Sequence, residues 1–190
     1  MHIRPATRAD SADLAILDDV ASSGLAAWLW SGAVARGEAS SALERGRQRF
    51  AAGEGEISWR NASIAEVDGD VAGMSVSYPL STVGEAADAP NAVLKPLYEL
   101  LSVIRGHRYI DALAVYNRHR GRGIGRGLMR HELDRSEGAI VSLITEDDNK
   151  AALGLYRALG FTEVARRPCT KFSPKQTTRE WVLLTRPATS

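Results

Sequence analysis

A glycine-rich run, Arg120-Gly121-Arg122-Gly123-Ile124-Gly125, stands between an apolar segment with the pattern of a strand and an amphipathic segment with the pattern of a helix. Glycine lets backbone N–H groups turn toward an anion, and the N-terminus of a following helix adds partial positive charge there. The two arginines add ionic contacts. Strand, loop and helix in this order predict a phosphate-binding loop in an α/β protein.

The spacing of the glycines argues against two common nucleotide-binding motifs. A Walker loop ends in Gly-Lys followed by Ser or Thr, and this run has no such ending. A dinucleotide-binding loop needs a third glycine three residues after the second, where this chain has Arg126 or Leu128. Both nucleotide interpretations are therefore weak. The structural alternative is a glycine-rich loop that carries solvated arginines.

A second motif lies downstream of the glycine-rich run. It reads Asn149-Lys150-Ala151-Ala152-Leu153-Gly154-Leu155-Tyr156, and Leu159-Gly160-Phe161 comes after it. Together the two motifs resemble the Arg/Gln-x-x-Gly-x-Gly/Ala and Asn-x-x-Ala-x-x-hydrophobic-Tyr signatures of the GNAT family of N-acetyltransferases. The resemblance in specific residues covers about residues 109–163. It implies an acyltransferase enzyme with acetyl-CoA as cosubstrate, whose pyrophosphate the glycine-rich run binds.

Length and composition limit the other partners. A chain of 190 residues with 44% hydrophobic residues fits one domain with a real core, so we expect a single domain over residues 1–190. A net charge of +1 argues against nucleic acid as a partner. No membrane partner is expected, because no apolar stretch is long enough to span one and the N-terminus lacks an apolar signal region. We therefore predict a cytoplasmic protein.

Local patterns predict most of the elements. The pair Asp68-Gly69 between two apolar runs indicates a β-hairpin. Asn149 or Asp148 suits the start of a helix that Gly160 ends. Helices are expected over about residues 11–22, 39–52, 94–103, 124–135 and 150–159, with Gly84 and Pro90 before the third, and strands over 3–6, 63–67, 71–77, 109–115, 139–144, 161–165 and 181–184.

The family resemblance implies how these elements assemble. We expect a mixed, mostly antiparallel sheet of about seven strands flanked by helices, with the central strands splayed apart around Leu113 and Leu143. The acetyl-CoA-binding core would cover about residues 108–165, and the acceptor side about residues 22–52 and 79–106. The cofactor-binding residues implied are Leu113, Ala114, Val115, Arg120, Gly121, Arg122, Gly123, Ile124, Gly125, Asn149, Ala152 and Tyr156, the first three as backbone partners of the pantetheine arm.

Acetyl transfer to an amine needs a neutral amine, a donor for the charge that develops on the thioester oxygen, and a proton for the leaving thiolate. The resemblance assigns the last role to Tyr156. Its structural alternative is a tyrosine packed on the apolar face of its helix beside Leu153. A backbone N–H of residues 113–115 would serve the oxygen. No metal is expected.

The base is chosen from two residues. Asp111 is the first choice, because a carboxylate inside a strand is uncommon unless it is paired or functional. By strand alternation it projects with Tyr109, Leu113 and Val115. His107, with an ordinary pKa of about 6.5, is the second choice, and its structural alternative is an exposed strand-end histidine. His119 and His131 are interpreted as surface residues.

The acceptor is predicted to be a small amine or an amino-acid-like molecule that attacks directly in a ternary complex. Protein-acetylating members of the family often carry a glutamate five residues before the motif asparagine, where this chain has Ile144. The acids after it, Glu146, Asp147 and Asp148, fit helix capping or solvent exposure. Cys169 lies outside both motifs, so a covalent acetyl-cysteine is not favoured.

Several alternatives stay open. The chain could instead acetylate a peptide or protein, or it could be a catalytically silent acyl-CoA-binding module. Trp28 and Trp30 either wall the acceptor site, where an ammonium would gain cation–π attraction, or fill the core or a subunit interface. The sequence does not decide whether the chain forms a homodimer.

Overall fold

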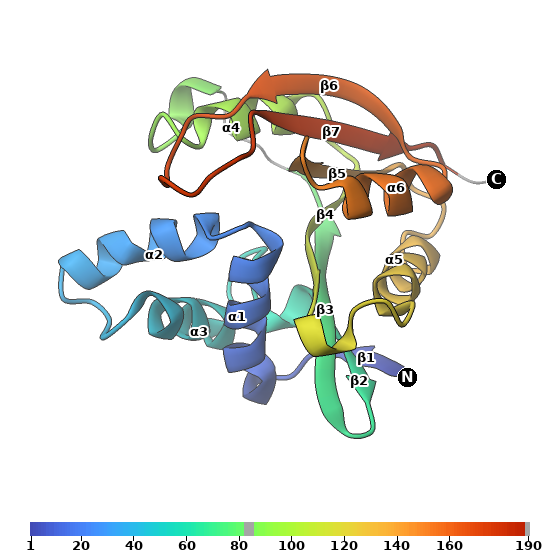
Figure 1. Ribbon diagram of the computed structural model, residues 1–190, viewed down its shortest axis with the longest axis horizontal. Coiled ribbons are helices and arrows are strands. Elements are labelled where there is room, and N and C mark those ends of the chain that lie inside the picture. The colour runs from blue at the N-terminus through green and yellow to red at the C-terminus, as the bar shows by residue number, and fades with distance from the viewer. Residues whose placement is uncertain (82–85, 189–190) are drawn as a thin grey trace. The chain divides into compact units, whose positions relative to one another are not determined.

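The computed structural model describes residues 1–81 and 86–188, and its described strands form one seven-stranded sheet in the order β1-β2-β3-β4-β5-β7-β6 (Figure 1). The strands are β1 His2–Pro5, β2 Ala62–Val67, β3 Asp70–Pro79, β4 Arg108–Val115, β5 Val141–Glu146, β6 Thr162–Pro168 and β7 Glu180–Arg186. The helices are α1 Ser11–Ala21, α2 Leu25–Ala35, α3 Ala42–Ala52, α4 Lys95–Ser102, α5 Ile124–Asp134 and α6 Lys150–Ala158. β4 and β5 are parallel, whereas β1–β2, β2–β3, β5–β7 and β6–β7 are antiparallel. The predicted fold class, a mixed and mostly antiparallel sheet with helices, is confirmed.

The chain divides into two compact units. The first contains Met1–Tyr78 and Asp111–Glu132, and the second contains Pro79–Ile110 and Leu133–Ser190. β4 therefore begins in the second unit and continues in the first. Among the described helices, none is long and apolar enough to cross a membrane.

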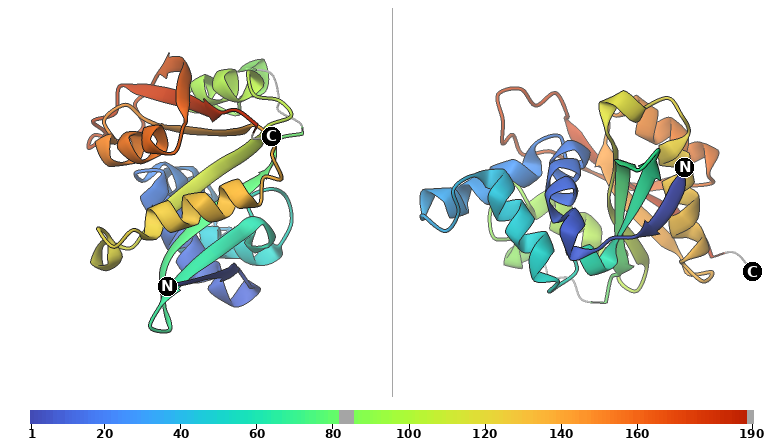
Figure 2. Two further views of the ribbon diagram at one scale, coloured as in Figure 1. Left: turned by 90° about the vertical axis from the view of Figure 1, so that its right-hand side faces the viewer. Right: turned by 90° about the horizontal axis from the view of Figure 1, so that it is seen from below.

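In the first unit, helices cover both faces of the strands. α1 and α3 pack together on one face of β1, β2 and β3, and α5 lies on the other (Figure 2). The hairpin of β2 and β3 turns at Asp68 and Gly69, whose φ angles of +54° and +86° are both left-handed. Such a turn matches the twist of paired strands, which explains the Asp-Gly signal in the sequence.

α2 is the element that the sequence patterns missed. Its residues are apolar almost all round, so they show no 3.6-residue stripe that would mark a helix face. The helix predicted over 39–52 begins later, at Ala42. α2 and α3 meet where the buried Trp30 covers Gly46, because a Cβ on Gly46 would lie 2.4 Å from the Trp30 ring. Trp30 is thus a core residue, whereas Trp28 is partly exposed.

In the second unit, α6 is capped as the sequence predicts. The Asn149 side chain accepts a 3.2 Å hydrogen bond from the Ala152 N–H, and Gly160 follows the helix with a φ of +85°. Asp147 and Asp148 do not cap α6 with their side chains. They accept hydrogen bonds from the segment before β7, including 3.0 Å from the Arg179 N–H and 2.6 Å from the Thr177 hydroxyl.

α4 also belongs to the second unit. Its Leu100 is fully buried, as the predicted apolar side requires. Pro96 lies in its first turn, where a missing N–H costs nothing. Gly84, expected before this helix, lies outside the described residues.

Candidate active site

The glycine-rich run forms a loop between β4 and α5 in the first unit. Gly121 and Gly123 have φ angles of +74° and +79°, a backbone region that other residues seldom adopt. A Cβ at either position would meet no atom within 4 Å. Glycine is therefore required at both positions by the shape of the backbone, and the space beside the loop is open.

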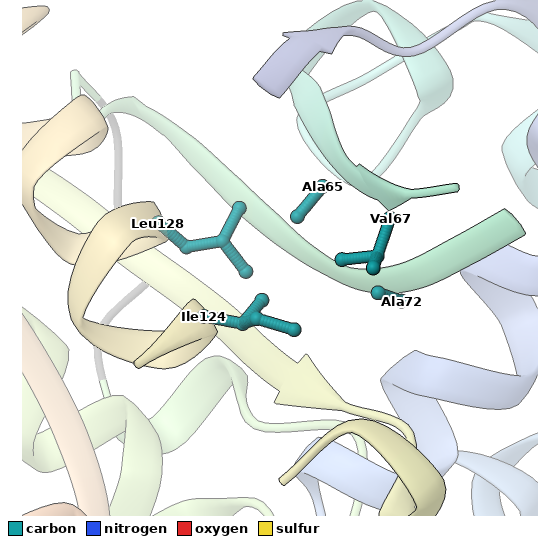
Figure 3. Close-up of a cluster of buried hydrophobic side chains, with 5 residues drawn as sticks. All are labelled: Ala65, Val67, Ala72, Ile124 and Leu128. Atoms are coloured by element: carbon teal, nitrogen blue, oxygen red, sulfur yellow. The ribbon is translucent and has the colours of Figure 1, made fainter. Parts of the chain in front are cut away.

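α5 is fixed with its N-terminus at this loop. Ile124 and Leu128 are buried in a cluster with Ala65, Val67 and Ala72 of β2 and β3 (Figure 3). The Gly127 N–H donates to the Gly123 carbonyl over 3.0 Å, so helical hydrogen bonding begins at Gly123. The first N–H groups of a helix have no partner within it, and they favour an anion. The open loop and this helix start fit a phosphate group of a cofactor.

The basic side chains near the loop are held in place. Arg120 Nε donates to the Val115 carbonyl over 3.1 Å. Arg118 Nε and Arg122 Nη1 lie 3.1 Å and 3.3 Å from the two ring nitrogens of His119. His119 is buried, so its interpretation as a surface residue is wrong. It packs between two arginines and orients the charge that they bring to the loop.

The end of β4 is not paired with β5. The register between the two strands runs from Arg108 opposite Val141 to Ile110 opposite Leu143 and ends there, although β4 continues to Val115. The pairing thus stops where the central strands are predicted to separate. Leu113, Ala114 and Val115, the predicted partners of the pantetheine arm, lie beyond it.

Asp111 lies in the first unit beside Tyr78 of β3. The Tyr78 hydroxyl donates to Asp111 Oδ1 over 3.1 Å. Burial raises the pKa of Asp111 to about 6, against the smaller opposing effect of the Tyr78 hydrogen bond. Leu113 and Val115 instead pack against the cluster that includes α5. Strand alternation predicts that Asp111 projects with Leu113 and Val115, but the contacts of Asp111 differ from theirs.

Asp18 of α1 is a candidate site residue that the sequence patterns missed. It is 8% exposed, and burial together with the charge of Asp111 raises its pKa to about 8. The charge of Arg49 in α3 opposes this shift. The signal was present, because Asp18 stands four residues after Leu14 and next to Leu17, on the apolar side of its helix. A carboxylate on such a face is unusual.

Tyr156 of α6 belongs to the second unit and is 8% exposed. Burial and the charge of Glu146 raise its pKa to about 12, so the hydroxyl keeps its proton at neutral pH. Among residues 1–81 and 86–188, no group forms a hydrogen bond with this hydroxyl. Glu146 is 5% exposed, so its interpretation as a solvated residue is wrong, and the side chain that caps α6 is that of Asn149.

His107 and Cys169 also lie in the second unit. His107 is partly buried, with Nδ1 2.7 Å from the Ser142 hydroxyl, and burial lowers its pKa. It is therefore not an exposed strand-end residue. Burial first, and then the charge of Glu146, raises the pKa of Cys169 to about 12. A thiol that stays protonated is a poor nucleophile.

The predicted site residues fall into two groups. Asp111, residues 113–115 and residues 120–125 are in the first unit. Asn149, Ala152 and Tyr156 are in the second. Within the described part of the chain, no three His, Cys, Asp or Glu side chains gather in a way that could hold a metal ion.

Comparison with known proteins agrees with this geometry. A model of the acetyltransferase (GNAT) family matches residues 24–161. The chain belongs to this family. The family predicted from the two sequence motifs is thus confirmed, and a GNAT protein is expected to use acetyl-CoA.

Individual relatives of this GNAT protein match it over different lengths. It is 45% identical over 58 residues to N-alpha-acetyltransferase RimI of Mycobacterium tuberculosis, which covers 30% of this chain and 37% of that protein. It is 37% identical over 59 residues to the uncharacterized protein ML0378 of Mycobacterium leprae, covering 31% of this chain and 16% of that one. The chain therefore spans well under half the length of these curated relatives.

Solved structures support the fold over the whole chain. The N-acetyltransferase of Staphylococcus aureus Mu50 superposes with a TM-score of 0.67 at 20% identity, over 97% of this GNAT chain and all of that one. At this identity the similarity shows the fold alone.

Proposed function

We propose that this chain is an acetyl-CoA-dependent N-acetyltransferase that acts on a small-molecule or amino-acid-like amine. The observation that carries the proposal is the loop at residues 121–123. Its two left-handed glycines leave open space in front of the N-terminus of α5. An anion fits such a position. Since the chain belongs to the GNAT family, the anion expected there is the pyrophosphate of coenzyme A.

The remaining contacts to acetyl-CoA follow from the motifs. Arg122 and the backbone at Gly121 to Gly125 would hold the pyrophosphate, with Arg120 fastened to the end of β4 behind them. The backbone of Leu113, Ala114 and Val115 would pair with the pantetheine arm, because β5 leaves that part of β4 unpaired. Asn149, Ala152 and Tyr156 would complete the site. In this proposal residues 1–190 act as one acetyltransferase domain.

Acetyl-CoA, when bound, supplies an acetyl group activated as a thioester. Asp111 is ionised at neutral pH with a pKa of about 6, so it can take the proton of the acceptor ammonium, directly or through water. Tyr156 keeps its proton and can donate it to the leaving thiolate. A backbone N–H of residues 113–115 would meet the thioester oxygen. The protonated Cys169 supports direct attack over a covalent acetyl-cysteine.

Two observations bear on the acceptor. Ile144, in place of the glutamate common among protein-acetylating relatives, supports a small amine. Similarity to N-alpha-acetyltransferase RimI supports a second candidate, the α-amino group of a peptide or protein. A catalytically silent acyl-CoA-binding module is disfavoured by the intact Tyr156. A cytoplasmic location and the absence of a nucleic-acid partner stay predictions, as does the alternative of a homodimer.

The proposal is tested by thermal unfolding with ligands and by an acceptor screen. Coenzyme A at about a hundred times its Kd should raise the melting temperature by roughly 5–10 °C, because it binds only the folded chain. Arg122→Ala should reduce this shift. Gly123→Val should abolish it, because a β-branched residue resists the left-handed backbone and fills the open space.

Gly69→Val is the matched control. Gly69 is also left-handed and also faces open space, but it lies in the β2–β3 hairpin. That variant should lose stability and keep the shift with coenzyme A. Thiol release from acetyl-CoA should then be measured with amines, amino acids, polyamines and short peptides. Equal shifts with NAD or ATP, or no transfer to any acceptor, would count against the proposal.

A further inference from the structure

A buried carboxylate without a partner stands on α1 in the first unit. The side chain of Asp18 has no hydrogen bond or ion pair with any of the described residues, although the residue is only 8% exposed. Its oxygens are not among the unpartnered atoms sealed completely from solvent. A charge in this setting is costly unless a proton or a cation joins it.

The charges that act on Asp18 come from α1, α3 and β4. Asp111 of β4 and Asp19 of α1 add negative charge, and Arg49 of α3 adds the positive charge that acts on it. The charge of Glu56, which follows α3, raises the pKa of Asp111. The Tyr78 hydroxyl of β3 donates a hydrogen bond to Asp111. Acids therefore outnumber bases around this pair. The local field favours a cation.

We propose that Asp18 and Asp111 together form a subsite that binds the ammonium group of an alkylamine without a carboxylate of its own. The inference rests on the proposed function, because the cation bound here would be the acetyl acceptor. It narrows the acceptor to a cationic amine, since a second negative group on the ligand would add to the negative charge that Asp19 and Glu56 already bring to this pair. It also gives Asp18 a role in recognition that neither sequence motif assigns.

The subsite exchanges a proton for the cation. With pKa values of about 8 for Asp18 and about 6 for Asp111, the pair holds about one proton at pH 7. An arriving ammonium stabilises both carboxylates, so that proton leaves for solvent. The ammonium can later give its own proton to Asp111, which leaves a neutral amine beside a single ionised carboxylate. Each binding event therefore releases about one proton.

Three molecules of similar size test the inference: n-butylamine, 1-butanol and 4-aminobutanoate. They share a four-carbon chain and differ in charge. Their effects on the melting temperature should be measured at pH 7 in the presence of saturating coenzyme A. n-Butylamine should raise the melting temperature of the wild type by about 2–4 °C at a concentration that fills the site. The alcohol and the amino acid should raise it by much less.

Titration calorimetry in two buffers of different ionisation enthalpy measures the released proton. Asp18→Asn should lose both the proton release and the shift with n-butylamine, while its shift with coenzyme A stays unchanged. Asp68→Asn, in the exposed hairpin turn, is the control and should behave as the wild type does. Equal shifts with n-butylamine and 1-butanol, no shift with n-butylamine, or a retained shift in Asp18→Asn would overturn the inference.

The outcomes separate this inference from the proposed function. Binding of n-butylamine through Asp18 without any acetyl transfer would leave the subsite standing and remove the activity. Acetyl transfer to other acceptors without cation binding at Asp18 would leave the proposed function standing and remove the subsite.

Discussion

At the scale of single residues, the structure gives the two candidate catalytic groups opposite protonation states at neutral pH. Asp111 is half-buried, and its pKa of about 6 leaves it mostly ionised. Tyr156 is buried near the negative Glu146, and its pKa of about 12 keeps it protonated. An ionised acceptor of protons and a protonated donor are what amine acetylation requires. The two assignments can be tested separately.

Replacement of Tyr156 by Phe removes the hydroxyl and retains the ring, whose centroid lies 6.0 Å from that of the Phe161 ring. The turnover number should fall by roughly ten- to a thousandfold, as expected for a lost proton transfer, while the KM for acetyl-CoA stays nearly constant. Single-turnover kinetics with the best acceptor would measure the chemical step. An unchanged chemical rate would make Tyr156 a packing residue.

Replacement of Asp111 by Asn retains the shape of the side chain and removes its basicity. The wild-type kcat/KM should rise with pH through about 6, where Asp111 ionises. In Asp111→Asn the rate at pH 7 should drop by roughly 10²–10⁴-fold and recover partly toward pH 10, where free amine accumulates.

His107→Gln is the comparison for that experiment, because His107 is the second candidate for the base and burial lowers its pKa below the ordinary 6.5. It should keep the wild-type pH profile. If His107→Gln loses the acidic limb, or if Asp111→Asn keeps it, the base has been assigned to the wrong residue. Circular dichroism of each variant would first establish that it is folded.

At the scale of elements, local signals predicted what local geometry determines. The left-handed Asp68 and Gly69, the cap at Asn149 and the glycines of the loop before α5 all follow from conformations that few residue types adopt. α2 has no such signal, because tertiary packing rather than an amphipathic stripe holds it.

The same division applies to the candidate site. The loop and Tyr156 were found through motifs. Asp18 became a candidate only through its interaction with Asp111, which lies far from it in the sequence. Glu146 was misjudged for a related reason. Its position at a strand end suggests exposure, but the fold of the second unit buries it. Long-range burial of this kind leaves little trace in the local sequence.

At the scale of the whole molecule, the buried acids make stability depend on pH. Asp18 and Asp111 hold protons more tightly in the folded chain than in the unfolded chain, whose Asp pKa is 3.8. The unfolded chain thus binds fewer protons between about pH 4 and pH 8, so these groups lower stability as pH rises through that window. Because burial lowers the pKa of His107, this residue makes stability rise as pH increases toward 6.5.

Comparison with Asp18→Asn isolates this effect, because His107 contributes equally to both proteins. The variant should gain stability over the wild type as pH rises from 5 to 8, with a melting temperature at pH 8 higher by at least about 2–4 °C, the shift that 1 kcal/mol produces. Thermal unfolding at four pH values would measure the difference. A constant difference across that range would mean that Asp18 is not a buried titrating group.

The fit of Trp30 over Gly46 has an evolutionary consequence. Any side chain at position 46 would collide with the indole, so a lineage can change that glycine only if position 30 loses bulk as well. The two positions are therefore inherited as a pair, and descendants of this protein should alter them together. Gly121 and Gly123 are constrained differently, since the backbone requires them whatever their neighbours become.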